Sequence, residues 1–385
     1  MKKLVVTICL IVVMATIAGI ICFSTQSNAN KSTPDESLSV EYSVGLDENG
    51  YYVNLDKYNF DVPNFKDMEI SIDNIIDFSI KKLKESKYEI ESETDFIDSY
   101  IVSYLESIDV NKKDVAEETD IVTVSLEFRD LEGNVMSDYT QDKMSIQIDN
   151  EGDSIVKSLI GRKVGDEYEV DYTFPEDDEN IPGKKAKVKV KVLVIAYADP
   201  IASGVFDKNI DRVKEDYPEV IDLDSFRKIL RPDIARDNLT AYLENLILNA
   251  NIDVPDEFIN YEYQRLLKRL NQIGYNYQEY LEQSNLTDAE VKETCKEVAA
   301  ENIISMLVFK DGGYEITDEK FKEVYGSEED INTYESYQGI PYMKLRIIRA
   351  TAMDIISSQV KLVDGNKVIS LNSSQKATPD EVVKN

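Results

Sequence analysis

Three segments in the middle of the chain alternate hydrophobic and polar residues with a period of two. They run from Asp120 to Phe128, from Glu167 to Phe174 and from Lys185 to Ile195. This period predicts strands that bury one face and expose the other to water. In the first strand the buried row is expected to be Val122, Val124, Leu126 and Phe128. The solvent-facing row is expected to be Ile121, Thr123, Ser125 and Glu127. Gly161 and Gly165 bracket a tight turn before the second strand.

Segments on both sides of these strands carry the spacing of three to four residues that is typical of amphipathic helices. The predicted helices cover 70–86, about 93–108 after an N-cap at Ser92, 225–251, a stretch from Pro255, 287–309, a stretch from Thr317, and 342–363. Pro232 is expected to kink or restart the third of them. Thr287 and Glu290 have the spacing of a capping box. The chain is therefore predicted to be α+β, with an antiparallel sheet joined to an all-α region.

These patterns give a domain plan. It comprises a targeting segment (1–29), a linker or short hairpin (30–60), a helical connector (61–115), a sheet domain (116–198), a helical domain (199–363) and a tail expected to be disordered (364–385).

The N-terminus has the features of an export signal. Lys2 and Lys3 precede an apolar run from Leu4 to Phe23, and small polar residues up to Ala29 follow. The run is long enough to cross a bilayer, so the segment is either cleaved after Ala29 or kept as a membrane anchor. Lipidation at Cys22 is a third alternative. We expect the protein outside the cytoplasm of a bacterium, secreted or anchored.

Charge and composition exclude several functional classes. The chain has 43 basic and 74 acidic residues, a formal net charge of −31, and no histidine. Such a surface repels phosphate backbones, so nucleic acid is not an expected partner. Without histidine, Ser-His-Asp and Cys-His sites and His-based zinc sites are excluded. We expect no cofactor and assign no metal site, and Cys295 is interpreted as a small buried helix residue.

Several motifs resemble trigger factor. Gly161 to Glu167, Phe174-Pro175-Glu176-Asp177 and the Lys-Val alternation after them resemble the second half of its FKBP-type prolyl isomerase domain. Val254-Pro255 and Ile316 to Glu319 resemble its C-terminal chaperone domain. The resemblance implies an FKBP-like antiparallel sheet with a short helix, joined to an all-α domain that binds unfolded polypeptide. It further implies a strand over 144–148 and the short helix over 153–159.

The resemblance also places candidate site residues. The family's proline pocket falls on Phe128, Met136, Ile155 and Val188, of which only Phe128 is aromatic. Isomerase activity is therefore expected to be weak or lost, because aromatic walls supply much of the contact with a proline ring. Phe128 is alternatively a core residue.

Tyrosines are the candidate client contacts in the helical domain: Tyr261, Tyr263, Tyr277, Tyr280 and Tyr342. Alternatively they are half-buried residues on helix faces. The expected function is that of an extracytoplasmic folding factor for unfolded exported polypeptides. It would contact the membrane through an uncleaved N-terminus and would not contact the ribosome, because an export signal stands where the family has its ribosome-binding domain. An active secreted prolyl isomerase and a surface adhesion module are the alternatives.

Overall fold

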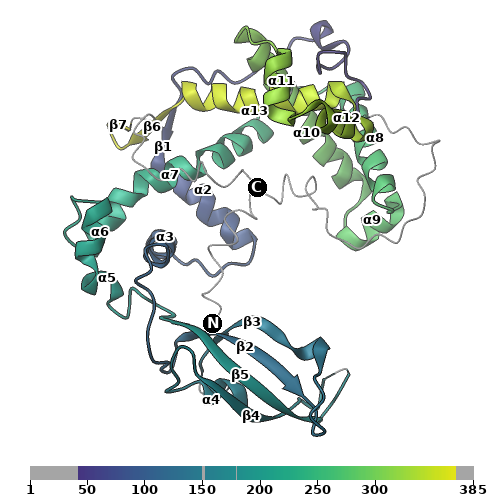
Figure 1. The fold of residues 1–385 in the computed structure, drawn as a ribbon. Helices are drawn as coiled ribbons and strands as arrows, with labels where there is room; N and C mark the ends of the chain where they lie inside the picture. Colours follow the sequence, from purple (N-terminus) through teal and green to yellow (C-terminus); the bar gives the residue numbers. More distant parts are fainter. Residues whose placement is uncertain (1–41, 150–151, 179, 370–385) are drawn as a thin grey trace. The chain divides into compact units, whose positions relative to one another are not determined.

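The computed structural model describes residues 42–369 except 150, 151 and 179. These residues form two compact units (Figure 1). Residues 83–231 make up the sheet unit, and residues 42–82 together with 232–369 make up the helical unit. The predicted α+β class is confirmed.

The sheet unit is built on four antiparallel strands in the order β3-β2-β5-β4. The strands are β2 (Ile121–Arg129), β3 (Gln141–Gln147), β4 (Glu167–Thr173) and β5 (Lys185–Ala196), with the short helix α4 (Ser154–Ser158) and the 3-10 turn η2 (Ser137–Tyr139). On the solvent side of β5, Lys187 and Lys191 pair with acids of β4, at 2.9 Å to Glu169 and 2.8 Å to Glu167. On its other side lie buried valines. The Lys-Val alternation thus gives β5 one charged and one core face.

Strand β2 departs from its predicted alternation. Ile121 and Thr123, expected in water, are buried together with Val122 and Val124. The register shifts between Thr123 and Val124 toward β5, and again beyond Val124 toward β3. Such bulges break the period of two, so consecutive residues are buried at this end of the strand.

Helices of the sheet unit are α3 (Glu93–Ser107), α5 (Val205–Lys208), α6 (Ile210–Asp216) and the first part of α7 (Leu223–Leu248). The predicted N-cap Ser92 is confirmed, and it forms a capping box with Asp95. Arg227 of α7 binds Asp98 of α3 at 2.7 Å, and Arg231 binds Glu93 at 2.5 Å. These pairs hold the two ends of the sheet unit together.

The helical unit contains α2 (Ile72–Glu85, its last residues counted with the sheet unit), the rest of α7, α8 (Asp256–Gln272), α9 (Tyr277–Ser284), α10 (Asp288–Asp311), α11 (Asp318–Tyr325), α12 (Glu328–Gln338) and α13 (Ile340–Gln359). Helix α10 packs against both α8 and α13 (Figure 1). The capping box of Thr287 and Glu290 is confirmed. Pro232 lies inside α7 and does not restart the helix.

A small sheet in the helical unit was not predicted. It joins β1 (Glu69–Ser71), β6 (Lys361–Asp364) and β7 (Lys367–Ile369) in the order β1-β6-β7, and β1 runs parallel to β6. The region after Pro200 is therefore not purely helical, and α13 ends at Gln359 instead of Val363. Strands of three or four residues are too short to show a period in the sequence.

The segment at 42–58 lies against the helices of its own unit. Its predicted hairpin is reduced to one bridge between Leu46 and Tyr52, around a turn at Asp47, followed by the 3-10 turn η1 (Leu55–Lys57). The export signal predicted at 1–29 lies outside the described residues. Within 42–369, no helix has the length and apolar character needed to span a bilayer.

Candidate functional site

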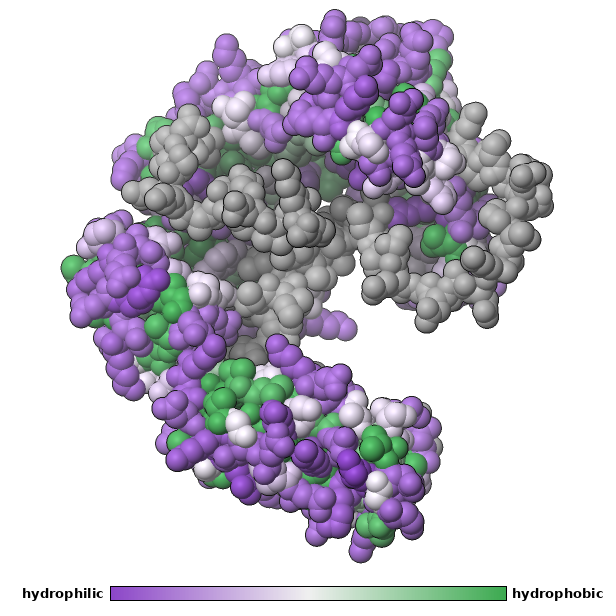
Figure 2. Space-filling model, viewed as in Figure 1, coloured by the Kyte–Doolittle hydropathy of each residue, from purple (hydrophilic) through white to green (hydrophobic). Residues whose placement is uncertain are grey.

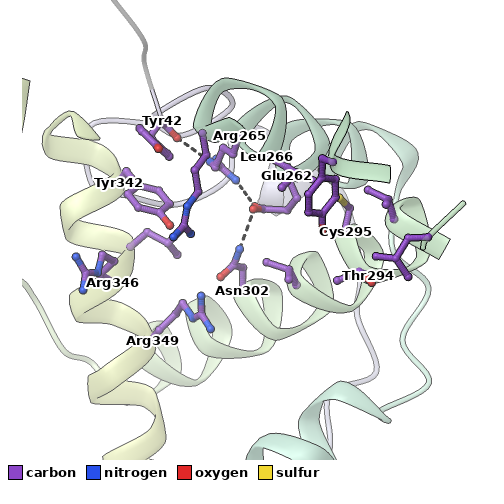
Figure 3. A pocket seen from close by; sticks show the side chains of 16 residues that line it. Tyr42, Glu262, Arg265, Leu266, Thr294, Cys295, Asn302, Tyr342, Arg346 and Arg349 are labelled. Carbon is purple, nitrogen blue, oxygen red and sulfur yellow. Dashed lines mark hydrogen bonds and ion pairs between the residues drawn. The ribbon is translucent and has the colours of Figure 1, made fainter. Parts of the chain in front are cut away.

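A cavity of about 120 Å³ opens among α8, α9, α10 and α13 of the helical unit (Figure 3). Its apolar wall consists of Leu266, Tyr280, Leu286, Val291, Val298 and Leu345. The volume is roughly ten times what one water molecule needs. The cavity can therefore admit a side chain or a chain end, but not a folded domain.

Arginines dominate the polar part of the lining. Arg265 and Arg269 come from α8, Arg346 and Arg349 from α13, and Glu262 is the acidic residue among the lining residues. This is unusual in a chain with a net charge of −31. The cavity is a locally basic site on an acidic protein, and such a site attracts anions.

A buried ion pair forms one side of the cavity. Arg265 binds the carboxylate of Glu262, and the two side chains are only 5% and 8% exposed. Tyr52 donates its hydroxyl hydrogen to the same carboxylate. Asn302 donates through Nδ2 to Glu262 Oε1 and to the Tyr52 hydroxyl, each at 3.0 Å. A buried charge needs such compensation, and here the pair and its partners supply it.

Arg265 also fixes the segment that precedes the helices. Its Nε donates to the carbonyl of Tyr42 at 2.7 Å, and an Nη donates to the carbonyl of Val44 at 2.5 Å. Gly45 then passes over the ring of Tyr261 with a φ of +74°. A Cβ at this glycine would lie 2.2 Å from that ring, so the close approach requires glycine.

The four arginines fall into two classes. Arg265 and Arg349 are matched by carboxylates, Glu262 and Glu301 respectively. Arg269 and Arg346 have no ion pair with any residue of the described ranges, and Arg346 makes only a long contact of 3.5 Å to Gln338. Two positive charges are thus left for a ligand or solvent.

Asn302 contributes an acceptor without a donor. Its Oδ1 is buried and has no hydrogen-bond partner in the part of the chain that the structure describes. The Nδ2 atom of Asn302 is the one that donates to Glu262, so Oδ1 is the other polar atom of the side-chain amide and does not contact this carboxylate (Figure 3). A buried acceptor of this kind is costly unless a donor arrives.

Cys295 lies in the same wall and is buried, which confirms its interpretation as a core residue. Burial raises the pKa of its thiol to about 12, and the charges of Glu262 and Asp288 act in the same direction. The thiol therefore stays protonated at neutral pH and is a poor nucleophile.

The five predicted client-binding tyrosines are distributed over three places. Tyr280 and Tyr342 line the cavity. Tyr263 and Tyr277 pack edge to face at 5.6 Å, and both donate to Asp288 Oδ1. Burial raises the pKa of the Tyr277 hydroxyl, and so do its neighbours Tyr263 and Asp288. The fifth, Tyr261, packs against aromatic rings beside Gly45 and does not line the cavity.

The predicted pocket residues of the sheet unit lie together in its core. Phe128, Ile155 and Val188 are buried, Met136 packs against them, and Phe128 and Val188 are register partners on β2 and β5. Three aromatic residues that were not among the predicted pocket residues lie around Phe128. Tyr139, Tyr172 and Phe174 surround Phe128 with centroid distances of 5.7 to 6.5 Å. We call Phe128, Tyr139, Tyr172 and Phe174 the aromatic cluster.

The described residues contain no group of three or more Asp, Glu, Cys or His side chains that could hold a metal ion.

Comparison with known proteins shows similarity to one family over part of the chain. Residues 224–357, which run from the start of α7 into α13, match the family described as bacterial trigger factor protein (TF) C-terminus. The chain is trigger factor-like. A trigger factor of Caldicellulosiruptor saccharolyticus is 29% identical over 233 residues, covering 54% of this chain and 52% of the relative. One from Staphylococcus carnosus is 30% identical over 190 residues, covering 46% and 41%.

The trigger factor-like chain spans about half the length of these curated relatives. A solved structure described as "Promiscuous Substrate Recognition in Folding and Assembly Activities of the Trigger Factor Chaperone" is 16% identical, with a TM-score of 0.36 and 70% of each chain covered.

The cavity arginines of this trigger factor-like chain were not singled out in the sequence. A signal was present, because Arg265 and Arg269 are four residues apart and Arg346 and Arg349 are three apart, which places each pair on one helix face. Same-sign pairs repel on an isolated helix. In a chain this acidic, two such pairs are a pattern that points to a basic site.

Proposed function

We propose that this protein is a folding chaperone that holds unfolded polypeptides through its helical unit. The observation that carries this is the match of residues 224–357 to the trigger factor C-terminal family. Those residues form most of the helical unit, including both helices that contribute the cavity arginines.

The surface of the helical unit supports the proposal. Helices α9 and α12 bury none of their residues. Several large apolar side chains on this unit are exposed, among them Ile273, Tyr275, Val324, Tyr334 and Tyr337. On the face seen in Figure 2, hydrophobic residues are scattered within a largely hydrophilic surface. Scattered contacts of this kind suit many unfolded chains, because they demand no particular sequence.

Aggregation of a chemically denatured client, followed by light scattering, tests the proposal. The full chain should suppress aggregation at a stoichiometric ratio. Replacing Ile273 and Tyr337 together by Ser should weaken suppression. The matched control replaces Leu131 and Val135, exposed apolar residues of the sheet unit, by Ser. An adhesion module should not suppress aggregation, so a wild-type chain without effect would remove the chaperone proposal.

We place the site of action outside the cytoplasm, on the membrane or secreted. The support is the sequence pattern from Lys2 to Ala29, with its basic start, apolar run and small polar end. Clients would then be exported polypeptides, and the ribosome would not be a partner. Mass spectrometry of the N-terminus after cell fractionation distinguishes a cleaved, an anchored and a lipidated chain, and a cytoplasmic chain beginning at Met1 would refute the location.

A second candidate function is prolyl isomerisation by the sheet unit. The aromatic cluster favours it, because Tyr139 and Tyr172 are only partly buried and lie beside the core residue Phe128. We expect activity to be weak, since Met136, Ile155 and Val188 stand where the family's pocket has aromatic residues. A proline-peptide isomerisation assay decides the matter. A rate above background that falls in Tyr172→Leu would assign activity to the cluster, and no acceleration by wild type would exclude it.

A further inference from the structure

We propose that the basic cavity of the helical unit binds the C-terminal carboxylate of a polypeptide whose last residue is aliphatic. Binding of the carboxylate depends only on the residues of the cavity. Its use in capturing clients rests on the proposed chaperone function.

The charges that line the cavity fit a single carboxylate. Arg265 and Arg349 are matched by Glu262 and Glu301, whereas Arg269 and Arg346 are left without an ion pair among the described residues. Arg346 is exposed at the rim, and Arg269 is half-buried. Guanidinium groups bind carboxylates through paired charge-assisted hydrogen bonds. The cavity therefore has free cationic donors for one small anion.

The cavity lining also includes a hydrogen-bond acceptor that has no donor among the described residues. Asn302 lines the same cavity as these arginines, and its buried Oδ1 lacks a donor within the described ranges. A ligand that satisfies both features has an N–H group close to its carboxylate. The last residue of a polypeptide has this arrangement, because its amide N–H and its carboxylate share one Cα. A free amino acid would instead bring an ammonium group next to the arginines.

Much of the remaining lining is aliphatic. Leu266, Leu286, Val291, Val298 and Leu345 form an aliphatic wall, and the ring of Tyr280 adds to it. An aliphatic side chain on the terminal residue would be taken out of water there. The small volume also excludes any occupant larger than a side chain or a chain end. The acidic surface of the whole chain disfavours multiply charged anions such as nucleotides compared with a single carboxylate.

The test uses the full chain and a fluorescently labelled hexapeptide, Gly-Ser-Gly-Ser-Ala-Leu, with the label at its N-terminus. Fluorescence anisotropy compares the free C-terminal acid with the C-terminal amide of the same peptide. The acid should bind about tenfold more tightly or better, because the amide loses the charge that the arginines bind. A peptide ending in Ser should bind more weakly than the one ending in Leu. Equal affinity for acid and amide would overturn the proposal.

Variants assign the binding to the cavity. Arg269→Gln combined with Arg346→Gln should lower the affinity for the acid by about tenfold or more. Neither arginine holds an ion pair with a described residue, so the double variant should retain its far-UV circular dichroism and unfolding midpoint. Arg212→Gln, on α6 of the sheet unit, removes a similarly partly exposed arginine outside the cavity and should leave binding unchanged. Unchanged binding in the folded double variant would refute the cavity assignment.

Two further measurements test the class of ligand and the link between peptide binding and chaperone function. Competition by N-acetyl-leucine as effective as that by the peptide would overturn the assignment to polypeptide ends in favour of free acylated amino acids. The aggregation assay runs in parallel. Suppression of aggregation without peptide binding refutes the carboxylate site and leaves the chaperone function. Peptide binding without suppression supports the site and refutes the chaperone function.

Discussion

Arg265 is predicted to be the side chain on which the helical unit depends most. Replacing it by Met keeps much of its volume but removes the guanidinium from an environment where the side chain is 5% exposed. The variant loses the ion pair to Glu262 and the hydrogen bonds to the carbonyls of Tyr42 and Val44. It also leaves the Glu262 carboxylate buried without a counter-charge.

Removing one partner of a buried pair costs about 3–5 kcal/mol of the free energy of unfolding. The complementary change, Glu262→Gln, should cost less, about 1–2 kcal/mol. In that variant Arg265 keeps both carbonyl acceptors, and the Gln oxygen can still accept from Tyr52 and Asn302. The double variant should cost less than the sum of the single costs, because the buried carboxylate is gone.

Urea unfolding followed by far-UV circular dichroism measures these costs. Two units need not unfold in one transition, so hydrogen exchange of α8 amides identifies the transition of the helical unit. A loss below about 1 kcal/mol in the free energy of unfolding of Arg265→Met would refute the stabilising role of the buried ion pair. An equal loss in Glu262→Gln would contradict the proposed asymmetry, and additive costs would show that the two residues are not coupled.

Three other changes test separate features. Gly45→Ala should destabilise the helical unit by more than Gly274→Ala, since both glycines have positive φ but only the first packs against a ring; equal melting temperatures would contradict this. Thr287→Ala should cost about 1 kcal/mol by removing the cap of α10, measured by urea unfolding, and an unchanged midpoint would argue against the cap. Cys295 should resist iodoacetamide at pH 8 until the chain unfolds, as read by peptide mass spectrometry. Burial raises the pKa of this thiol from 9.0 to about 12, so its contribution to stability is complete below pH 9 and is lost as the pH rises toward 12.

Local sequence signals predicted the frame of the fold. Lys-Val alternation located β5 because Lys187, Lys189 and Lys191 face water and acids of β4, while the valines between 188 and 192 are buried. Ser92 and Thr287 located two helix starts because a cap acts through neighbouring backbone groups. Features that depend on distant residues were missed. The pairing of β1 with β6 joins segments far apart in the chain, and neither strand has a readable period.

The candidate site was only partly predictable for a similar reason. The pattern of α8 points to Leu266 and Leu267 as its buried side, whereas Glu262 and Arg265 are buried there and both leucines are only partly buried. A charged pair can be buried only when partners from elsewhere satisfy it, and here Tyr52 comes from a segment about 210 residues away. A prediction from hydrophobic periodicity places charged residues on the solvent-exposed face of a helix. It therefore predicts that the face containing the site is exposed.

The parallel pairing of β1 with β6 also constrains the order in which the chain folds. It brings Ser71 and Val363 together, so the helical unit closes only after roughly 290 further residues have been made. The sheet unit, residues 83–231, lies wholly within this loop and can fold first. The ion pair between Arg231 and Glu93 joins two points inside the segment between β1 and β6. It shortens the effective length of this loop to about half, and so lowers the entropic cost of closing it by about 0.6 kcal/mol. During synthesis from the N-terminus, the helical unit would therefore be the last part of the described chain to close.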